Sequence, residues 1–267
     1  MALAIAGLPV LLSTDHPSLR AEAARRYQKY ATDQPPRLQA EVEVDDSLPF
    51  VAGWEVEPRF SRGAILFNQN GFRAEIDAGA GVASLQISAH HMADSLEYFL
   101  RAVWSALAFQ AGGLLFHAAG IQRRGKVDLF FGPSGSGKST LALLSTGHTI
   151  LNDDLVVLMP AGGHWTAHAT PFWNRQNRTL DKGPRAGALR ALYRLVQDRE
   201  VYLEQLPAPD ALAELLAGIP LLAADPARSA EMMDRCQNLT EAAGVYALHF
   251  RKDRTFWQVL PPNRVRK

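Results

Sequence analysis

The chain has 267 residues, 47% of them hydrophobic, and a formal net charge of +1 at pH 7. This length and composition can build the core of one large domain or of two intimate ones. The balanced charge gives no case for nucleic acid as a partner. A single cysteine, Cys236, excludes an intramolecular disulfide and indicates a reducing compartment. Because no apolar run reaches about 18 residues, the sequence predicts no membrane span and a cytoplasmic protein.

Residues 1–92 are expected to form a β-rich N-terminal layer. A polar helix is predicted from Pro17 to Tyr30, because a proline in the first turn loses no helical hydrogen bond. Asn70-Gly71 supplies the positive φ angles of a tight hairpin. The prediction is an antiparallel sheet and not the start of an alternating strand–helix chain. Its strands are expected at residues 8–13, 38–44, 64–67, 72–76 and 82–88.

A helix is predicted from Asp94 to Gln110. Asp94 and Glu97 have the spacing of a capping box, in which the two side chains satisfy free N–H groups of the first turn. Apolar residues, including Leu100 and Val103, follow at helical spacing on one face. We expect this helix to be wedged between the N-terminal layer and the rest of the chain, with Leu100 and Val103 almost fully buried.

The strongest motif runs from Gly132 to Thr140, Gly-Pro-Ser-Gly-Ser-Gly-Lys-Ser-Thr, and it fits the phosphate-loop pattern G-x-x-x-x-G-K-[ST]. A short apolar strand precedes it, and a helix that ends near Gly147 is predicted after it. Glycines let successive backbone N–H groups face a polyphosphate. The motif predicts that the chain binds a nucleoside triphosphate. The expected contact residues are Gly132, Ser134, Gly135, Ser136, Gly137, Lys138, Ser139 and Thr140.

Two acids, Asp153 and Asp154, follow the next predicted strand. In a phosphate loop of this kind Lys138 reaches the β- and γ-phosphates, and the Ser139 hydroxyl ligates Mg²⁺. Acids at the mouth of an apolar strand downstream of such a loop favour a second metal ligand and a proton acceptor. The residues alone leave open which acid takes which part, and the competing interpretation is a pair of solvated turn residues.

The sequence predicts the secondary structure of the C-terminal half less clearly. Residues 170–205 fit helix and strand equally, and helices are predicted over 209–217 and from Asp225 to Ala242. Strands over 245–250 and 255–260 are predicted to form a closing hairpin. An arginine that neutralises the leaving phosphate could come from the first of these regions. The candidates are Arg175, Arg178, Arg185 and Arg190, most of which are expected to be solvated.

Three segments occur together in one order: Leu115-Phe-His-Ala-Ala-Gly120, the glycine loop, and Leu151-Asn-Asp-Asp154. This combination resembles the HPr kinase/phosphorylase family, whose fold is shared with phosphoenolpyruvate carboxykinase, and the resemblance covers residues 114–160. It implies a mixed α/β fold in which residues 93–267 form the kinase core with its phosphate loop. The Thr-Pro-Phe-Trp stretch that begins at Thr170 is similar to HPr-kinase-like proteins of peptide-modification gene clusters.

The resemblance implies an enzyme that uses ATP and Mg²⁺. Lys138, Asp153, Asp154 and His117 match its catalytic positions, and Ser139 with Asp153 would hold the metal. The family's later E-x-R-G-x-G and P-G-R-N stretches are absent from this sequence. The resemblance therefore does not extend to the HPr protein as acceptor or to a reverse phosphorylase activity.

The leading hypothesis is a kinase that phosphorylates a serine-type hydroxyl on a peptide or protein, such as the precursor of a modified peptide. One alternative is a small-molecule kinase that acts on free serine or resembles a carboxykinase. Another is a nucleotide-gated binding protein without catalysis. No nucleic acid or membrane partner is expected, and a homo-oligomer is left open.

Overall fold

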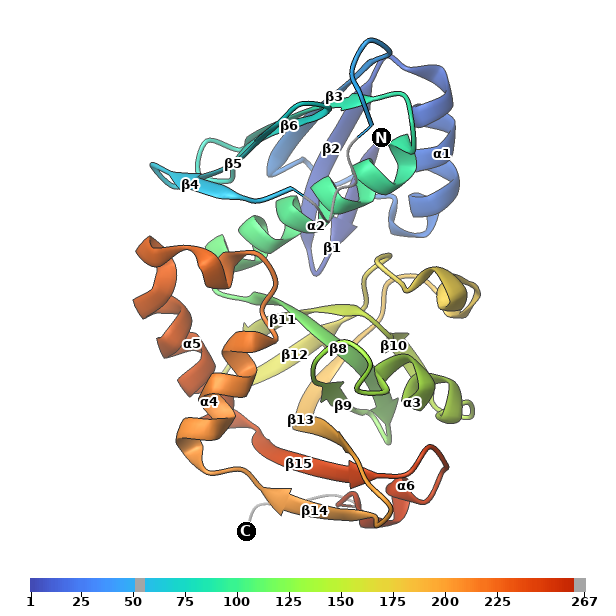
Figure 1. Ribbon diagram of the computed structural model, residues 1–267, viewed down its shortest axis with the longest axis vertical. Helices are drawn as coiled ribbons and strands as arrows, with labels where there is room; N and C mark the ends of the chain where they lie inside the picture. Colours follow the sequence, from blue (N-terminus) through green and yellow to red (C-terminus); the bar gives the residue numbers. More distant parts are fainter. Residues whose placement is uncertain (51–55, 262–267) are drawn as a thin grey trace.

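The computed structural model describes residues 1–50 and 56–261, in which two β-sheets lie on either side of a long helix, α2 (Met92–Gln110) (Figure 1). Helix α2 contacts strands of both sheets. None of the helices in the described ranges combines the length and the apolar character that crossing a bilayer requires.

The N-terminal sheet consists of β1 (Ala2–Ile5), β2 (Leu8–Thr14), β3 (Leu38–Asp45), β4 (Arg59–Ser61), β5 (Ala64–Gln69), β6 (Phe72–Asp77) and β7 (Val82–Ser88). Its strand order over the described residues is β1-β2-β3-β7-β6-β5-β4. The sheet is mixed, so the expected antiparallel layer is wrong in its centre, where β3 pairs in parallel with β2 and β7. Parallel strands need a crossover. Helix α1 (Pro17–Tyr27) and the 3₁₀ turn η1 (Gln28–Tyr30) form the one between β2 and β3.

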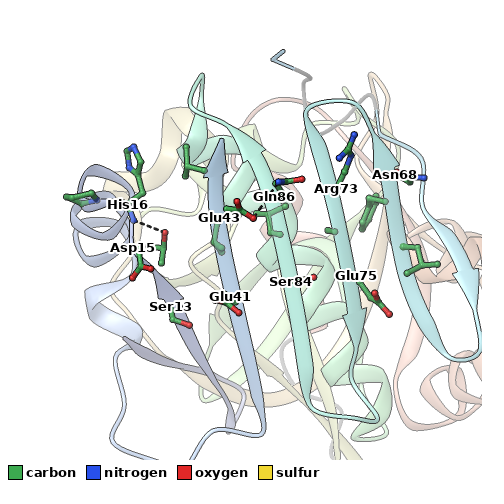
Figure 2. Close-up of a pocket in the computed structure, with 18 residues that line it drawn as sticks. Ser13, Asp15, His16, Glu41, Glu43, Asn68, Arg73, Glu75, Ser84 and Gln86 are labelled. Atoms are coloured by element: carbon green, nitrogen blue, oxygen red, sulfur yellow. Dashed lines mark hydrogen bonds between the residues drawn. The ribbon is translucent and has the colours of Figure 1, made fainter. Parts of the chain in front are cut away.

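Side chains alternate across this sheet as the sequence predicts. In β3, Leu38, Ala40 and Val42 are buried, and the residues between them are exposed. Polar side chains cover the outer face, where they line an open groove of about 1080 Å³. Figure 2 shows among them Glu41, Glu43, Arg73, Glu75, Ser84 and Gln86. An exposed sheet face ordinarily carries such residues.

The second sheet consists of β8 (Leu114–Arg123), β9 (Lys126–Phe131), β10 (Thr149–Asn152), β11 (Leu155–Ala161), β12 (His164–His168), β13 (Ala186–Gln197), β14 (Tyr202–Gln205) and β15 (Gly244–Phe250). Strands β8, β11, β12, β13 and β9 pair in a closed cycle. Strand β13 resolves much of the undecided region 170–205. It pairs in parallel with β9 and β15, so this sheet is also mixed.

The remaining helical segments are η3 (Arg175–Leu180), α3 (Lys138–Leu144), α4 (Ala208–Ala217), η4 (Leu222–Ala224), η5 (Pro226–Arg228), α5 (Ser229–Ala242) and α6 (Phe256–Val259). The predicted closing hairpin is wrong, because α6 replaces its second strand. Both edges of β15 are already paired, one with β13 and one with β14. The buried Phe256 packs instead against Phe130 and Phe250.

Helix α2 starts two residues before the predicted position and lacks the capping box. Its N-cap is His91 in a left-handed conformation, without a side-chain hydrogen bond to the first turn, and Glu97 pairs instead with arginines. Leu100 and Val103 are both 0% exposed, as expected. Buried residues of both sheets form one continuous cluster around this helix. The division into residues 1–92 and 93–267 stays a prediction.

Candidate functional site

The predicted phosphate loop connects β9 to α3. Strand β9 lies between β8 and β13, and α3 begins at Lys138. Gly137 has a φ of +108°, and a Cβ on it would lie 2.8 Å from Cζ of Phe250. Both the backbone angle and the space therefore require glycine. Gln197 at the end of β13 donates a hydrogen bond to the Gly135 carbonyl at 2.7 Å, which fastens the loop from its other side.

Lys138 points back into this loop. Its ammonium donates hydrogen bonds to the carbonyls of Gly132 at 2.8 Å and of Pro133 at 3.1 Å, and the residue is only 7% exposed. Burial lowers the pKa of Lys138, and the negative charges of Asp154 and Asp153 partly offset this effect. The cation is thus held between the glycine loop and the acid pair.

The acid pair lies in the turn from β10 to β11, which Asn152 holds in place. The Asn152 side-chain oxygen accepts from the backbone N–H groups of Asp154 at 2.6 Å and Leu155 at 2.9 Å. Its amide nitrogen donates to the Thr170 carbonyl at 2.9 Å. All these groups except Asp154 are buried, so the turn that carries both acids has little freedom to move.

The two acids lie in different surroundings. Asp153 is 1% exposed, and its oxygens accept from the backbone N–H of Asn174 at 3.1 Å and from the Asn177 amide at 2.6 Å. The Asp154 carboxylate is more accessible. It lies 2.8 Å from Nε2 of His117 and 3.1 Å from the Arg101 guanidinium.

These neighbours decide the protonation of Asp154. Burial by itself would raise the pKa of this carboxyl. The hydrogen bond from His117 and the charges of Arg101, His117 and Lys138 outweigh burial, so the pKa of Asp154 lies below its usual range. Asp154 is therefore a carboxylate at neutral pH, with an imidazole beside it.

Arg101 was not predicted as a site residue. Its spacing on α2 gives no signal, because the fold alone brings it to Asp154. None of the predicted arginines whose side chains are described contacts the acid pair directly. Arg190 pairs with the buried Asp128, Arg178 pairs with Glu97, and Arg185 is exposed. The side chain of Arg175 lies outside the described part of the structure. Arg101 is also bound to Glu97 at 2.8 Å, which fixes its position.

Most of the predicted site residues line one hollow of about 310 Å³. It brings together three segments that are distant in the sequence: β8 at His117, the glycine loop with α3, and the acid turn. Of the predicted residues, Gly132 and Ser136 are not among those that line it. Its lining residues are His117, Ser134, Gly135, Gly137, Lys138, Ser139, Thr140, Asp153, Asp154, Asn174 and Lys252.

The hollow has the donor atoms that Mg²⁺ prefers. Over the described residues, no group of three His, Cys, Asp or Glu side chains forms a ready metal cage. Mg²⁺ in phosphate sites needs no such cage, because it keeps several waters and is held by one or two carboxylates together with substrate phosphates. Ser139 and Asp153 line the same hollow, and a hydroxyl and a carboxylate are ligands of this kind, so the residues present fit this ion.

We expect His117→Ala to raise the pKa of Asp154, because it removes the hydrogen bond that most opposes the effect of burial. A carboxyl whose pKa is lower in the folded state than in the unfolded state stabilises the fold at pH values above its unfolded pKa of about 3.9. This stabilisation is lost as the pH falls through the folded-state pKa. In His117→Ala, protonation of Asp154 at low pH should therefore cost less folding stability than it does in the unmodified chain. An NMR titration of the Asp154 carboxyl carbon measures the shift directly. An unchanged titration midpoint would contradict the assigned contact.

No protein-family model matches the chain, and no curated protein matches it. Among solved structures, the Hpr(Ser) kinase/phosphatase from Coxiella burnetii is similar at a TM-score of 0.27 and 14% sequence identity. The match covers 51% of this chain and 85% of that chain. A likeness at this level carries no argument about fold or activity.

Proposed function

We propose that the chain is a phosphotransferase that moves the γ-phosphoryl group of ATP to a serine-type hydroxyl on a peptide or protein. The observation that carries the proposal is the shared hollow, in which Lys138, Ser139, Asp153, Asp154 and His117 meet. To catalyse phosphoryl transfer, a protein must mainly position the two substrates, neutralise the phosphate charge and supply a proton acceptor. The hollow contains a residue suited to each of these functions.

The surroundings of the two acids favour separate roles. Asp153 is held by two N–H donors and lines only the nucleotide side, so it suits a fixed metal ligand together with Ser139. Mg²⁺ bound there would neutralise phosphate charge. Asp154 is more exposed and has its imidazole neighbour, so it suits the proton acceptor. Lys138 would contact the transferred phosphoryl group.

The reaction balances with these residues. The acceptor hydroxyl gives its proton to an oxygen of Asp154, and the acceptor oxygen forms a bond to the γ-phosphorus. The bond between that phosphorus and the β–γ bridging oxygen breaks, and ADP leaves with the electron pair. Asp154 then releases its proton to water. Arg101 and His117 keep the carboxylate oriented throughout.

The first test of this proposal concerns nucleotide binding. Lys138→Ala should abolish productive binding of Mg²⁺–ATP, because it removes the charged contact of the loop. Calorimetry measures the affinity, and a circular dichroism melt checks that the variant is folded. Lys252→Ala, at the rim of the same hollow, is the matched control and should have a smaller effect. Unchanged ATP affinity in folded Lys138→Ala would reject the loop as the phosphate site.

A further inference from the structure

A second hollow, of about 520 Å³, lies between α2 and residues 220–224. We propose that this pocket binds the acceptor, and that the acceptor is a neutral peptide segment with a bulky apolar side chain next to its hydroxyl residue. The proposal rests on the proposed function, since it names the substrate class of the same site. Four observations carry it.

The first observation is that the two hollows meet at the acid–imidazole pair. His117 and Asp154 line both of them, whereas Asp153 and Lys138 line only the hollow at the glycine loop. A molecule in the second pocket therefore reaches Asp154 from a hollow that Lys138 and Asp153 do not line. Transfer needs two adjoining hollows, because the acceptor hydroxyl must reach both Asp154 and the γ-phosphorus of a bound nucleotide.

The second observation is the character of the walls. Arg101 and Ala102 lie three and four residues after Tyr98, and Ser105 lies four and three residues after them, so these side chains form one stripe of α2. Leu115 and Leu155 of the second sheet are also part of the lining, and prolines and alanines complete most of the rest. Such a surface favours an apolar occupant.

The third observation concerns charge. Among the described residues that line the pocket, the acidic and basic side chains other than His117 are Arg101 and Asp154, and these pair with each other. Arg101 also holds Glu97. A free amino acid would bring an ammonium and a carboxylate into this pocket with no unpaired partner for either, which is costly. A segment inside a peptide carries neither charge, so peptide is favoured over free serine.

The fourth observation is the Ser105 hydroxyl. The residue is 1% exposed, and its oxygen has no hydrogen-bond partner among the described residues. Buried hydroxyls are normally satisfied, and each exception calls for an explanation. Because Ser105 lines the pocket, a backbone N–H or C=O of a bound peptide would satisfy it.

The opposite wall shows strain of the kind found at ligand clamps. Leu221 has φ 67° and ψ −67°, and the Leu222 N–H donates to the Pro220 carbonyl at 2.8 Å, so these residues form a γ-turn that is rare for a branched residue. Such strain persists where the surrounding structure enforces it, often beside a ligand. Here it holds Leu221 in the wall of the pocket.

The test uses acetyl-X-Ser-X-amide peptides, with X as Leu, Gly, Lys or Glu, together with free serine. Binding to the full chain is measured by NMR titration without nucleotide, and transfer is measured separately with labelled Mg²⁺–ATP. We expect the Leu peptide to bind about tenfold or more tightly than the Gly peptide, the effect of burying one such side chain. The Lys and Glu peptides and free serine should bind more weakly still.

Two variants locate the binding. Ser105→Ala should weaken binding of the Leu peptide by about threefold to tenfold, the usual effect of one hydrogen bond, without lowering the melting temperature. Ser95→Ala is the matched control, a buried serine of the same helix outside the pocket. Ala223→Trp, at an exposed position of the pocket, should block the peptide and leave ATP affinity unchanged.

The outcomes separate the two proposals. Equal binding of the Leu and Gly peptides, or Leu-peptide binding that neither Ser105→Ala nor Ala223→Trp weakens, would overturn the acceptor pocket, whether or not transfer occurs. Peptide binding that follows the expected pattern without any transfer supports the pocket and counts against the kinase reaction alone.

Discussion

Asp154→Asn should lower the rate of phosphoryl transfer by about 10²- to 10⁴-fold, the usual contribution of a general base. Nucleotide affinity should change little, because the loop and Lys138 are untouched. An amide cannot accept the acceptor's proton, although it fills the same space beside His117 and Arg101. Single-turnover kinetics with labelled ATP measure the transfer step, and calorimetry measures the affinity.

Three further variants make this result specific. Asp210→Asn changes an exposed acid in the first turn of α4 and should leave transfer unaffected. Asp153→Asn should instead raise the Mg²⁺ concentration needed for half-maximal rate, since we assign the metal to that carboxylate. Near-normal turnover by the Asp153→Asn, Asp154→Asn double variant would refute the acid pair as the site.

Leu100→Ala should lower the free energy of unfolding by about 2–5 kcal/mol, the cost of a large-to-small change in a closed core. Leu100 is fully buried on the helix that both sheets share. Both sheets should therefore lose protection together, and amide hydrogen exchange in β3 and β13 reports on each. Urea unfolding of Leu100→Ala gives the free energy.

The matched control for this change is Gln110→Ala, at the exposed end of the same helix, which should alter stability by no more than about 0.5 kcal/mol. A stable Leu100→Ala variant, or exchange that increases in only one sheet, would show that α2 does not join the two layers as described.

Much of the fold could be predicted where local sequence determines local structure. The hairpin at Asn70-Gly71 forms between β5 and β6 as expected, and Gly71 takes a positive φ of +101°. The expected positive φ at Asn70 is wrong, because Asn70 is not among the residues with that backbone angle. The strand, glycine loop and α3 also appear in the predicted order. Each of these features depends on neighbours within a few positions.

Features that depend on distant partners could not be predicted. Ala191, Leu192 and Tyr193 of β13 are consecutive and all buried, so both faces of the strand are covered and the polar alternation of a half-exposed strand is lost. The parallel pairing of β3 is likewise decided by which strands lie beside it.

The site shows the same division. The glycine loop and the acids carry local motifs that the sequence displays. Arg101 carries no motif, and only the packing of α2 against the second sheet brings it to Asp154. Asn152, which holds the acid turn, has no role in the predicted site. A buried polar residue before two acids is a signal that could have identified it.

Helix α2 also limits how the chain can be divided or recombined. Leu100 and Arg101 are adjacent, so one turn of this helix serves the shared core and the acid that we assign to catalysis. Expressing residues 93–267 alone would uncover the surface of α2 that packs against β6 and β7. It would also remove Arg26, which lies 3.3 Å from Glu97. The N-terminal sheet is therefore not an exchangeable module. A chimera with another such layer would have to rebuild both the apolar contacts and the charge partners of α2 to keep this helix packed and Arg101 beside Asp154.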